Sequence, residues 1–206
     1  MRLVLASASP ARLATLRAAG LAPDVVVSDV DEDAVGAAAA PESVAALAGV
    51  LATAKAGAVA ARVEGEAVVL GGDSILEVDG APLGKPGTDA ETRARWAQVA
   101  GRAAVLHTGH CVLLVRGGEV VGRAEAVSST VVRFGRPTDD ELAAYVASGE
   151  PQQVAGGFTI DGLGGWFVDA VDGDHHTVVG VSLPTVRRLL HEVGVTLTDL
   201  GWPARS

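Results

Sequence analysis

The segment VVLGGDSILEVDGAPLGKP, residues 68–86, decides the fold prediction because it joins a buried strand directly to a hairpin. Val68–Leu70 is a short apolar run typical of a buried strand, and it leads into Gly71–Asp73. Two later runs, Ile75–Val78 and Pro82–Leu83, flank an Asp-Gly pair, which is a hairpin signal. The segment therefore predicts a sheet that contains antiparallel pairing as well as buried strands.

The rest of the chain alternates helical and extended patterns around this segment. Capping boxes at Thr88–Glu91 and Thr138–Glu141 each predict the start of a helix. Helices are expected at residues 10–19, 41–63, 88–101, 138–149 and 185–192, and strands at residues 2–6, 25–27, 104–134 and 166–171. Crossover helices mixed with hairpins predict an α/β fold with a mixed sheet, formed by one domain over residues 1–206.

Composition excludes several classes of function. The 206 residues include 16 Lys and Arg against 25 Asp and Glu, and this net charge of −9 argues against a nucleic-acid or anionic-membrane binder. Cys111 is the only cysteine, which excludes an internal disulfide and a cysteine-based zinc site. No long uncharged apolar run or signal-peptide core is present, so we expect no membrane span and a cytoplasmic protein.

Two polar segments near the N-terminus are candidate binding sites. Ser7–Arg12 follows the first predicted strand, with Ser9 as a helix N-cap, and a helix start with a nearby arginine favours a phosphate. An ordinary cap with a surface arginine explains the same pattern. Asp29–Asp33 holds four carboxylates, which predict a solvated loop or, alternatively, a site for a hard cation such as Mg²⁺.

Asp73 and Lys85 lie where predicted strands end. Asp73 follows a buried strand beside two glycines, a place where α/β sheets bind ligands, although a turn aspartate is an equal alternative. The motif at residues 83–86 is not a P-loop, because Asp79 stands where glycine is needed and Pro86 where Ser or Thr is needed. Lys85 is predicted to be a rigidly presented cation, with a solvated lysine as the alternative.

The remaining polar residues give weaker signals. Lys55 is the only lysine in its alanine-rich helix, where a surface lysine is the default. His107, His110 and the pair His175-His176 suggest transition-metal ligation, but no helical pair or cysteine supports it.

Taken in order, eight short motifs resemble the Maf family of nucleoside triphosphate pyrophosphatases. Ser7–Arg12 is similar to the family's opening Ser-x-Ser-Pro-Arg-Arg, and Leu83–Pro86 to its Leu-Gly-Lys-Pro. The other matches are Val30–Glu32, Ala52–Ala56, Asp73-Ser74, Thr108-Gly109, Gly157–Gly162 and Thr177–Pro184. Each motif alone is weak, but together they cover nearly the whole chain in the family's order.

This resemblance implies an elongated α/β fold with two lobes around a central nucleotide cleft, as in inosine triphosphatases. It implies hydrolysis of a nucleoside triphosphate between the α- and β-phosphates, which gives a nucleoside monophosphate and pyrophosphate. It also implies a divalent cation (Mg²⁺ or Mn²⁺), a cytoplasmic setting and a homodimer.

Roles of single residues follow from the same resemblance. Asp73 matches the family's proton acceptor, and we expect it to activate water and to hold the metal together with Glu32. The residues expected to bind phosphate are Ser7, Ser9, Arg12, Lys55 and Lys85.

Three departures from the family's motifs bear on the choice of base. Ala11 replaces the first arginine of the family's pair, Ser74 replaces threonine, and Asp161 replaces glutamine. In the family the positions of Arg12, Ser74 and Asp161 are linked to base selection. An ionised Asp161 accepts hydrogen bonds but donates none, which argues against a preference for uracil or thymine. A carboxylate can accept from the N–H groups of guanine, so 7-methylguanine and a broad range of bases are the alternatives.

Two other functions are alternatives. A non-catalytic regulator of septum formation would bind nucleotide or a protein partner without turnover, and it would not need the set Glu32, Lys55, Asp73 and Lys85. An inosine-triphosphate-type pyrophosphatase carries Ser/Thr-x-Asn followed by Lys near its N-terminus, and this sequence lacks that motif.

Overall fold

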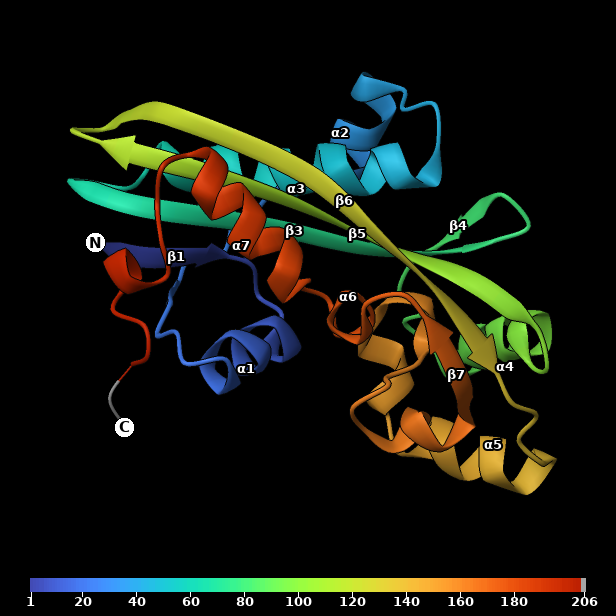
Figure 1. Cartoon of the computed structure of the whole chain (residues 1–206). Helices are drawn as coiled ribbons and strands as arrows, with labels where there is room; N and C mark the ends of the chain where they lie inside the picture. The colour runs from blue at the N-terminus through green and yellow to red at the C-terminus, as the bar shows by residue number, and fades with distance from the viewer. Residues whose placement is uncertain (205–206) are drawn as a thin grey trace.

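The computed structural model describes residues 1–204 and contains a seven-stranded mixed sheet in the order β2-β1-β3-β5-β6-β7, with β4 paired to β3 (Figure 1). The strands are β1 Arg2–Ala6, β2 Asp24–Val25, β3 Glu66–Val78, β4 Ala81–Leu83, β5 Ala103–Arg116, β6 Glu119–Phe134 and β7 Val168–Asp172. β1 is parallel to β2 and β3, whereas the other neighbours are antiparallel. The predicted mixed α/β sheet flanked by helices is confirmed.

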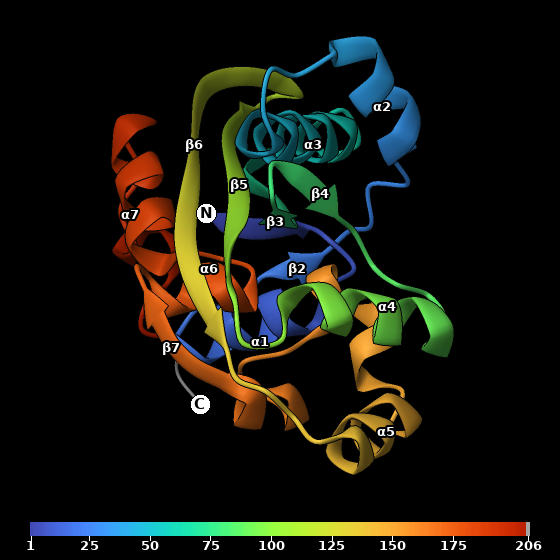
Figure 2. The same ribbon diagram turned by 90° about the vertical axis from the view of Figure 1, so that its right-hand side faces the viewer.

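Helices cover both faces of this sheet. They are α1 Pro10–Ala18, α2 Glu32–Ala39, α3 Val44–Ala60, α4 Asp89–Val99, α5 Asp139–Ala147, α6 His175–Val179 and α7 Leu183–Glu192. Figure 2 shows α3 and α7 on opposite sides of the long pair β5–β6. Within residues 1–204, no helix combines the length and the apolarity that a membrane crossing requires.

Apolar side chains divide into clusters according to the face of the sheet. On β3, Leu70 packs with α1 and α7, whereas Val69 packs with α3, because successive side chains of a strand point to opposite faces. A further cluster surrounds the buried Trp96 of α4 and includes Phe134 and Tyr145. The helices therefore bury different stretches of the same long strands.

Helix α3 lies directly on the backbone of β3 and β5. A Cβ atom at Gly71 would collide with the carbonyl oxygen of Ala52, and one at Gly109 would collide with that of Ala48. Because glycine alone leaves this space free, the alanine-lined face of α3 comes close to the sheet. This close packing brings Lys55, one turn beyond Ala52, within reach of β3.

Two parts of the site region differ from the sequence-based prediction. β3 runs without a break from Glu66 to Val78, so Asp73 lies within a strand and not at its end, because β5 pairs with β3 along this stretch. Glu32 lies in the first turn of α2 and not in a loop. The Asp31 side chain caps this helix by accepting from Ala34 N at 3.0 Å, and acidic residues favour a helix N-terminus.

Several element boundaries also differ. α3 ends at Ala60 and β2 covers only Asp24–Val25, so both are shorter than expected. Trp166 lies in the 3-10 segment Leu163–Phe167, and β7 follows it. Helix α6 was not predicted, since its five residues are too few to show a helical period.

Candidate functional site

A gap in the strand pairing of β3 marks the candidate site. β1 pairs with β3 as far as Ala6, opposite Gly71, and β4 pairs with the same edge only from Leu76 onward. Between these points no strand among residues 1–204 pairs with this edge, and Asp73 and Ser74 lie in the gap. Their side chains point to opposite faces of the sheet. The gap lets side chains from the segments after β1 reach the strand.

Lys55 joins two carboxylates on the α3 side of this gap. Its Nζ lies 2.5 Å from Asp73 Oδ1 and 2.7 Å from Glu32 Oε1. The side chains of Lys55 and Asp73 are each 10% exposed, whereas Glu32 is 53% exposed. A buried ammonium needs such partners, so the surface-lysine interpretation is wrong. Three predicted site residues thus meet, one each from α2, α3 and β3.

Arg12 occupies the other side of the same gap. Its guanidinium donates to Gly180 O at 2.7 Å, to Ser7 Oγ at 2.9 Å and to Ser74 Oγ at 2.9 Å. Burial lowers the pKa of Arg12, while the carboxylates of Asp73 and Glu32 act to raise it. Arg12 is therefore buried, and the surface-arginine interpretation is wrong. Glu32, Lys55, Asp73 and Arg12 are called the charged cluster below.

Ser9 caps a helix, as its position in the sequence predicts. It is the N-cap of α1, and its Oγ accepts from Arg12 N at 3.4 Å. Its own N–H donates to Ser7 Oγ at 3.2 Å. The helix start and the arginine are therefore tied to the same turn after β1.

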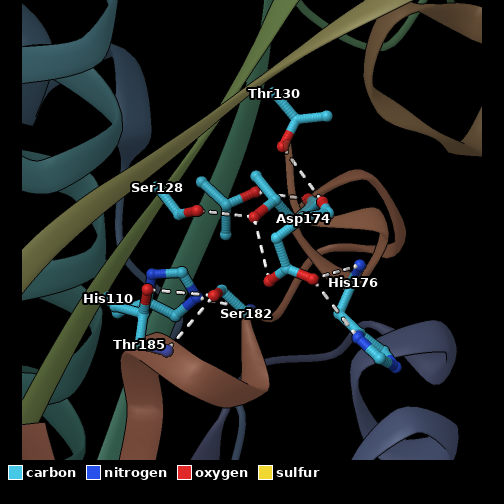
Figure 3. A network of polar contacts seen from close by, with 9 residues as sticks. His110, Ser128, Thr130, Asp174, His176, Ser182 and Thr185 are labelled. Atoms are coloured by element: carbon cyan, nitrogen blue, oxygen red, sulfur yellow. Dashed lines mark hydrogen bonds and ion pairs between the residues drawn. The ribbon is translucent and has the colours of Figure 1, made fainter. Parts of the chain in front are cut away.

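A network of hydroxyl groups holds Ser74 and Gly180, two of the hydrogen-bond acceptors of Arg12, in place. Thr108 Oγ1 donates to Thr177 O at 2.8 Å and shares a hydrogen bond of 2.9 Å with Ser74 Oγ. Nearby, His110 Nε2 accepts from Ser182 N at 2.9 Å (Figure 3). These bonds fix α6 and the turn before α7 against β5, and that turn contains Gly180.

Sequence reasoning assigned no role to most of this network. Thr108 and Thr177 lie in motifs of the Maf resemblance, and these motifs locate the segments but not their contacts. For His110 the sequence suggests only metal ligation. The available signal was a polar residue inside an otherwise apolar strand, which must find a hydrogen bond when buried.

Lys85 and Asp161 lie outside the contacts of the cluster. Both are exposed, and within residues 1–204 neither side chain makes a hydrogen bond or ion pair. The backbone around Lys85 is held by Arg95, which donates to the carbonyl oxygens of Gly84 and, at 3.2 Å, Lys85. The structure thus brings seven of the predicted site residues into two groups of direct contacts: Glu32, Lys55 and Asp73 on one side of the gap, and Ser7, Ser9, Arg12 and Ser74 on the other.

Two cavities lie elsewhere. One of about 450 Å³ is lined mainly by α3 and the Arg123-Glu125 pair of β6. Another of about 540 Å³ is lined by Tyr145, Leu163, Trp166 and neighbours around α5. No residue of the charged cluster lines either one.

The two carboxylates of the cluster suit a hard divalent cation. In the described part of the chain no group of three or more His, Cys, Asp or Glu side chains is placed to hold a metal. Glu32 and Asp73 each have a second carboxylate oxygen that accepts no hydrogen bond from residues 1–204. Mg²⁺ prefers oxygen ligands and keeps several waters, so one or two carboxylates completed by water and phosphate fit it.

The fold and the site define a class: a mixed α/β protein in which a buried lysine pairs with two carboxylates on one side of a gap in the sheet, while a buried arginine, suited to bind an anion, lies on the other side. Residues 2–193 match the family model described as Maf-like protein. The chain therefore belongs to the Maf family, which confirms the resemblance.

Several relatives of the chain carry the name "Nucleoside triphosphate pyrophosphatase". The protein of that name from Nocardia farcinica is 58% identical, and the match covers 98% of each chain. Its counterpart from Streptomyces coelicolor is 56% identical over 100% of this chain and 97% of the relative. That from Saccharopolyspora erythraea is 54% identical over 98% of each.

Proposed function

We propose that this protein is a nucleoside triphosphate pyrophosphatase, a hydrolase of acid anhydrides that cleaves between the α- and β-phosphates. The name of its full-length relatives supports this reaction class. The single observation that carries the proposal is the pairing of Lys55 with Asp73 and Glu32 beside the buried Arg12. This arrangement supports a role for Asp73 as a base beside cations that would bind phosphate.

Asp73 is the proposed proton acceptor. Lys55 holds its Oδ1 at 2.5 Å, and Oδ2 accepts no hydrogen bond from the described residues, which leaves one oxygen for water. Water attacks the α-phosphorus and its proton passes to Asp73, while the bond from the α-phosphorus to the bridging oxygen breaks, so that pyrophosphate leaves and the nucleoside monophosphate remains. A positioned base of this kind contributes about 10²- to 10⁴-fold to the rate.

The charge of the cluster supports a requirement for a divalent cation. Arg12 and Lys55 are balanced by Glu32 and Asp73, so these four side chains together carry no net charge. A polyphosphate is strongly anionic and the whole protein has a net charge of −9. Glu32 and Asp73 would hold Mg²⁺ or Mn²⁺, which supplies positive charge to the phosphate oxygens when bound.

The remaining predicted residues have separate tasks in this proposal. Arg12, Lys55, Lys85 and the α1 start at Ser7 and Ser9 bind the phosphates. Base selection belongs to Ser74 and Asp161 together with Arg12. Asp161 is exposed, so its carboxylate is free to accept from N–H groups of a base.

Pyrophosphate release from a panel of ordinary and modified triphosphates, with Mg²⁺, with Mn²⁺ or with a chelator, tests the proposal. Wild type should release pyrophosphate only with metal, and Asp73→Asn should lower turnover by about 10²- to 10⁴-fold. Asp79→Asn is the matched control, since Asp79 lies just beyond β3 and pairs with Arg102 at 2.6 Å on the surface. Full activity of Asp73→Asn removes the mechanism, and no release by wild type favours the non-catalytic regulator.

A further inference from the structure

One carboxylate outside the cluster gathers three donors from a single loop. Glu150 begins the 3-10 segment Glu150–Gln153. Its Oε1 accepts from Thr159 Oγ1 at 2.5 Å and from Gly164 N at 3.0 Å, while its Oε2 accepts from Leu163 N at 3.0 Å. Both ends of the loop at residues 159–164 are therefore tied to one side chain.

The loop has little other support. Tyr145 of α5, 4% exposed, accepts from Thr159 N through its hydroxyl at 3.3 Å. Within residues 159–164 no helix longer than the start of a 3-10 turn and no strand is formed. Asp161 lies at the centre of this loop, between the two points that Glu150 holds. Without Glu150 the loop would keep the Tyr145 contact at Thr159 and the hydrogen bond from Gly165 N to Gly162 O at 3.1 Å, and neither is made by Asp161 itself.

Glu150 is suited to hold this loop at neutral pH. Burial raises the pKa of Glu150, but the hydrogen bonds from Thr159, Leu163 and Gly164 outweigh it and hold the pKa below the ordinary value. The carboxylate is therefore ionised, and a charged acceptor makes stronger hydrogen bonds than a neutral one.

The same segment also adjoins the loop that carries Lys85. Gln152 O accepts from Gly87 N at 3.4 Å, and Gly84 O accepts from Gly156 N at 3.3 Å. The residues that follow Glu150 thus connect the backbone beside Lys85 with the backbone that leads to Asp161. The segment at residues 150–156 therefore lies next to Lys85, one of the proposed phosphate-binding residues.

We propose that Glu150 is a positioning residue for base selection: it holds the loop at residues 159–164 so that Asp161 faces the base of the bound nucleotide. This inference rests on the proposed function and deepens it. The Glu150 carboxylate itself touches no substrate, since all three hydrogen bonds that it accepts come from the loop at residues 159–164. Its effect appears in the ratio of kcat/KM between bases, and not in the hydrolytic step.

The test compares Glu150→Ala and Glu150→Gln with wild type. In Glu150→Ala the ratio of kcat/KM between the best and the second-best base should fall about tenfold, mainly through KM, with little change in kcat. Glu150→Gln keeps one acceptor oxygen and should lie between the two. Glu141→Gln is the control, because Glu141 accepts from Thr138 N at 2.7 Å and only caps α5.

A second measurement does not depend on turnover. The amides of Leu163 and Gly164 should exchange hydrogen faster in Glu150→Ala than in wild type, because both lose their acceptor. The double variant Glu150→Ala, Asp161→Ala should show the same base ratio as Asp161→Ala alone, since Glu150 acts through Asp161.

The outcomes separate the two proposals. If wild type hydrolyses no triphosphate, the proposed function and the selection role are both overturned. If wild type is active but Glu150→Ala keeps its base ratio, or the exchange of the two amides is unchanged, the Glu150 inference alone is overturned. Additive effects in the double variant would likewise exclude action through Asp161.

Discussion

His110 makes the stability of this protein sensitive to mild acid. The ring is 1% exposed, Nε2 accepts from Ser182 N at 2.9 Å, and Nδ1 has no hydrogen-bond partner within residues 1–204. Burial, and then the charge of Arg12, lower the pKa of His110 from 6.5 to about 4. A proton on Nε2 would also break the bond from Ser182. The folded state therefore binds this proton much more weakly than the unfolded chain.

The sign and the size of the effect follow from this difference. Above the unfolded pKa of about 6.5 both states are neutral, so His110 costs nothing, and stability is lost as the pH falls from there toward about 4. At about 1.36 kcal/mol per pH unit, the complete loss is about 3 kcal/mol, of which about 2.5 kcal/mol is reached at pH 4.5. This is a large share of the stability of an ordinary domain.

Urea unfolding of wild type and His110→Gln at pH 7.5 and pH 4.5 measures it. Gln keeps an acceptor for Ser182 but does not titrate, so the contributions of carboxylates cancel in the comparison. Wild type should lose about 2.5 kcal/mol more than the variant between the two pH values. Parallel losses in the two proteins would refute the reasoning, since they would mean that His110 is protonated equally easily in both states.

Two further predictions concern packing and the hydroxyl network. Gly109→Ala should lower the free energy of unfolding by about 1–3 kcal/mol or more, because the new Cβ meets the Ala48 carbonyl, whereas Gly57→Ala, with no neighbour within 4 Å, should raise it by up to about 1 kcal/mol. Similar denaturation midpoints for the two variants would contradict the close packing of α3. Thr108→Val should cost about 1–3 kcal/mol in the same assay, because it removes the buried donor to Thr177 O; an unchanged midpoint would show that water replaces this bond.

Local sequence signals placed most of the elements. Both predicted capping boxes mark helix starts: Thr88 and Thr138 accept from the backbone N–H three residues later. The β5–β6 hairpin turns at Gly117-Gly118 as expected. These features depend on contacts only a few residues apart, which a single sequence displays directly.

The length of β3 could not be predicted in this way. Gly71 and Gly72 resemble the end of a strand, because glycine is uncommon inside strands. In the structure Gly71 is needed within the strand, where α3 lies against the bare backbone. That requirement comes from a helix elsewhere in the sequence, so local propensity favours the wrong boundary.

Contacts of the candidate site were beyond local reasoning for the same reason. The motifs named Arg12, Lys55 and Asp73, yet the simplest interpretation of each was a surface or turn residue. Arg12 is buried against a segment that is distant in sequence, since its acceptor Gly180 lies 168 residues further along the chain. Burial and ion pairing depend on such distant partners, which only the folded chain brings together.

The register of β3 connects the two halves of the proposed site. Asp73 and Ser74 are neighbours in the chain, and their side chains point to opposite faces, where Lys55 and Arg12 hold them. A slip of one residue would exchange the faces and break both contacts at once. Gly71 opposes this slip in one direction, because Leu70 brought under α3 would place a Cβ against the carbonyl of Ala52. Gly71, which obscures the strand in the sequence, thus helps the pairing with β1 and β5 to keep Asp73 on the side of Lys55 and Ser74 on the side of Arg12.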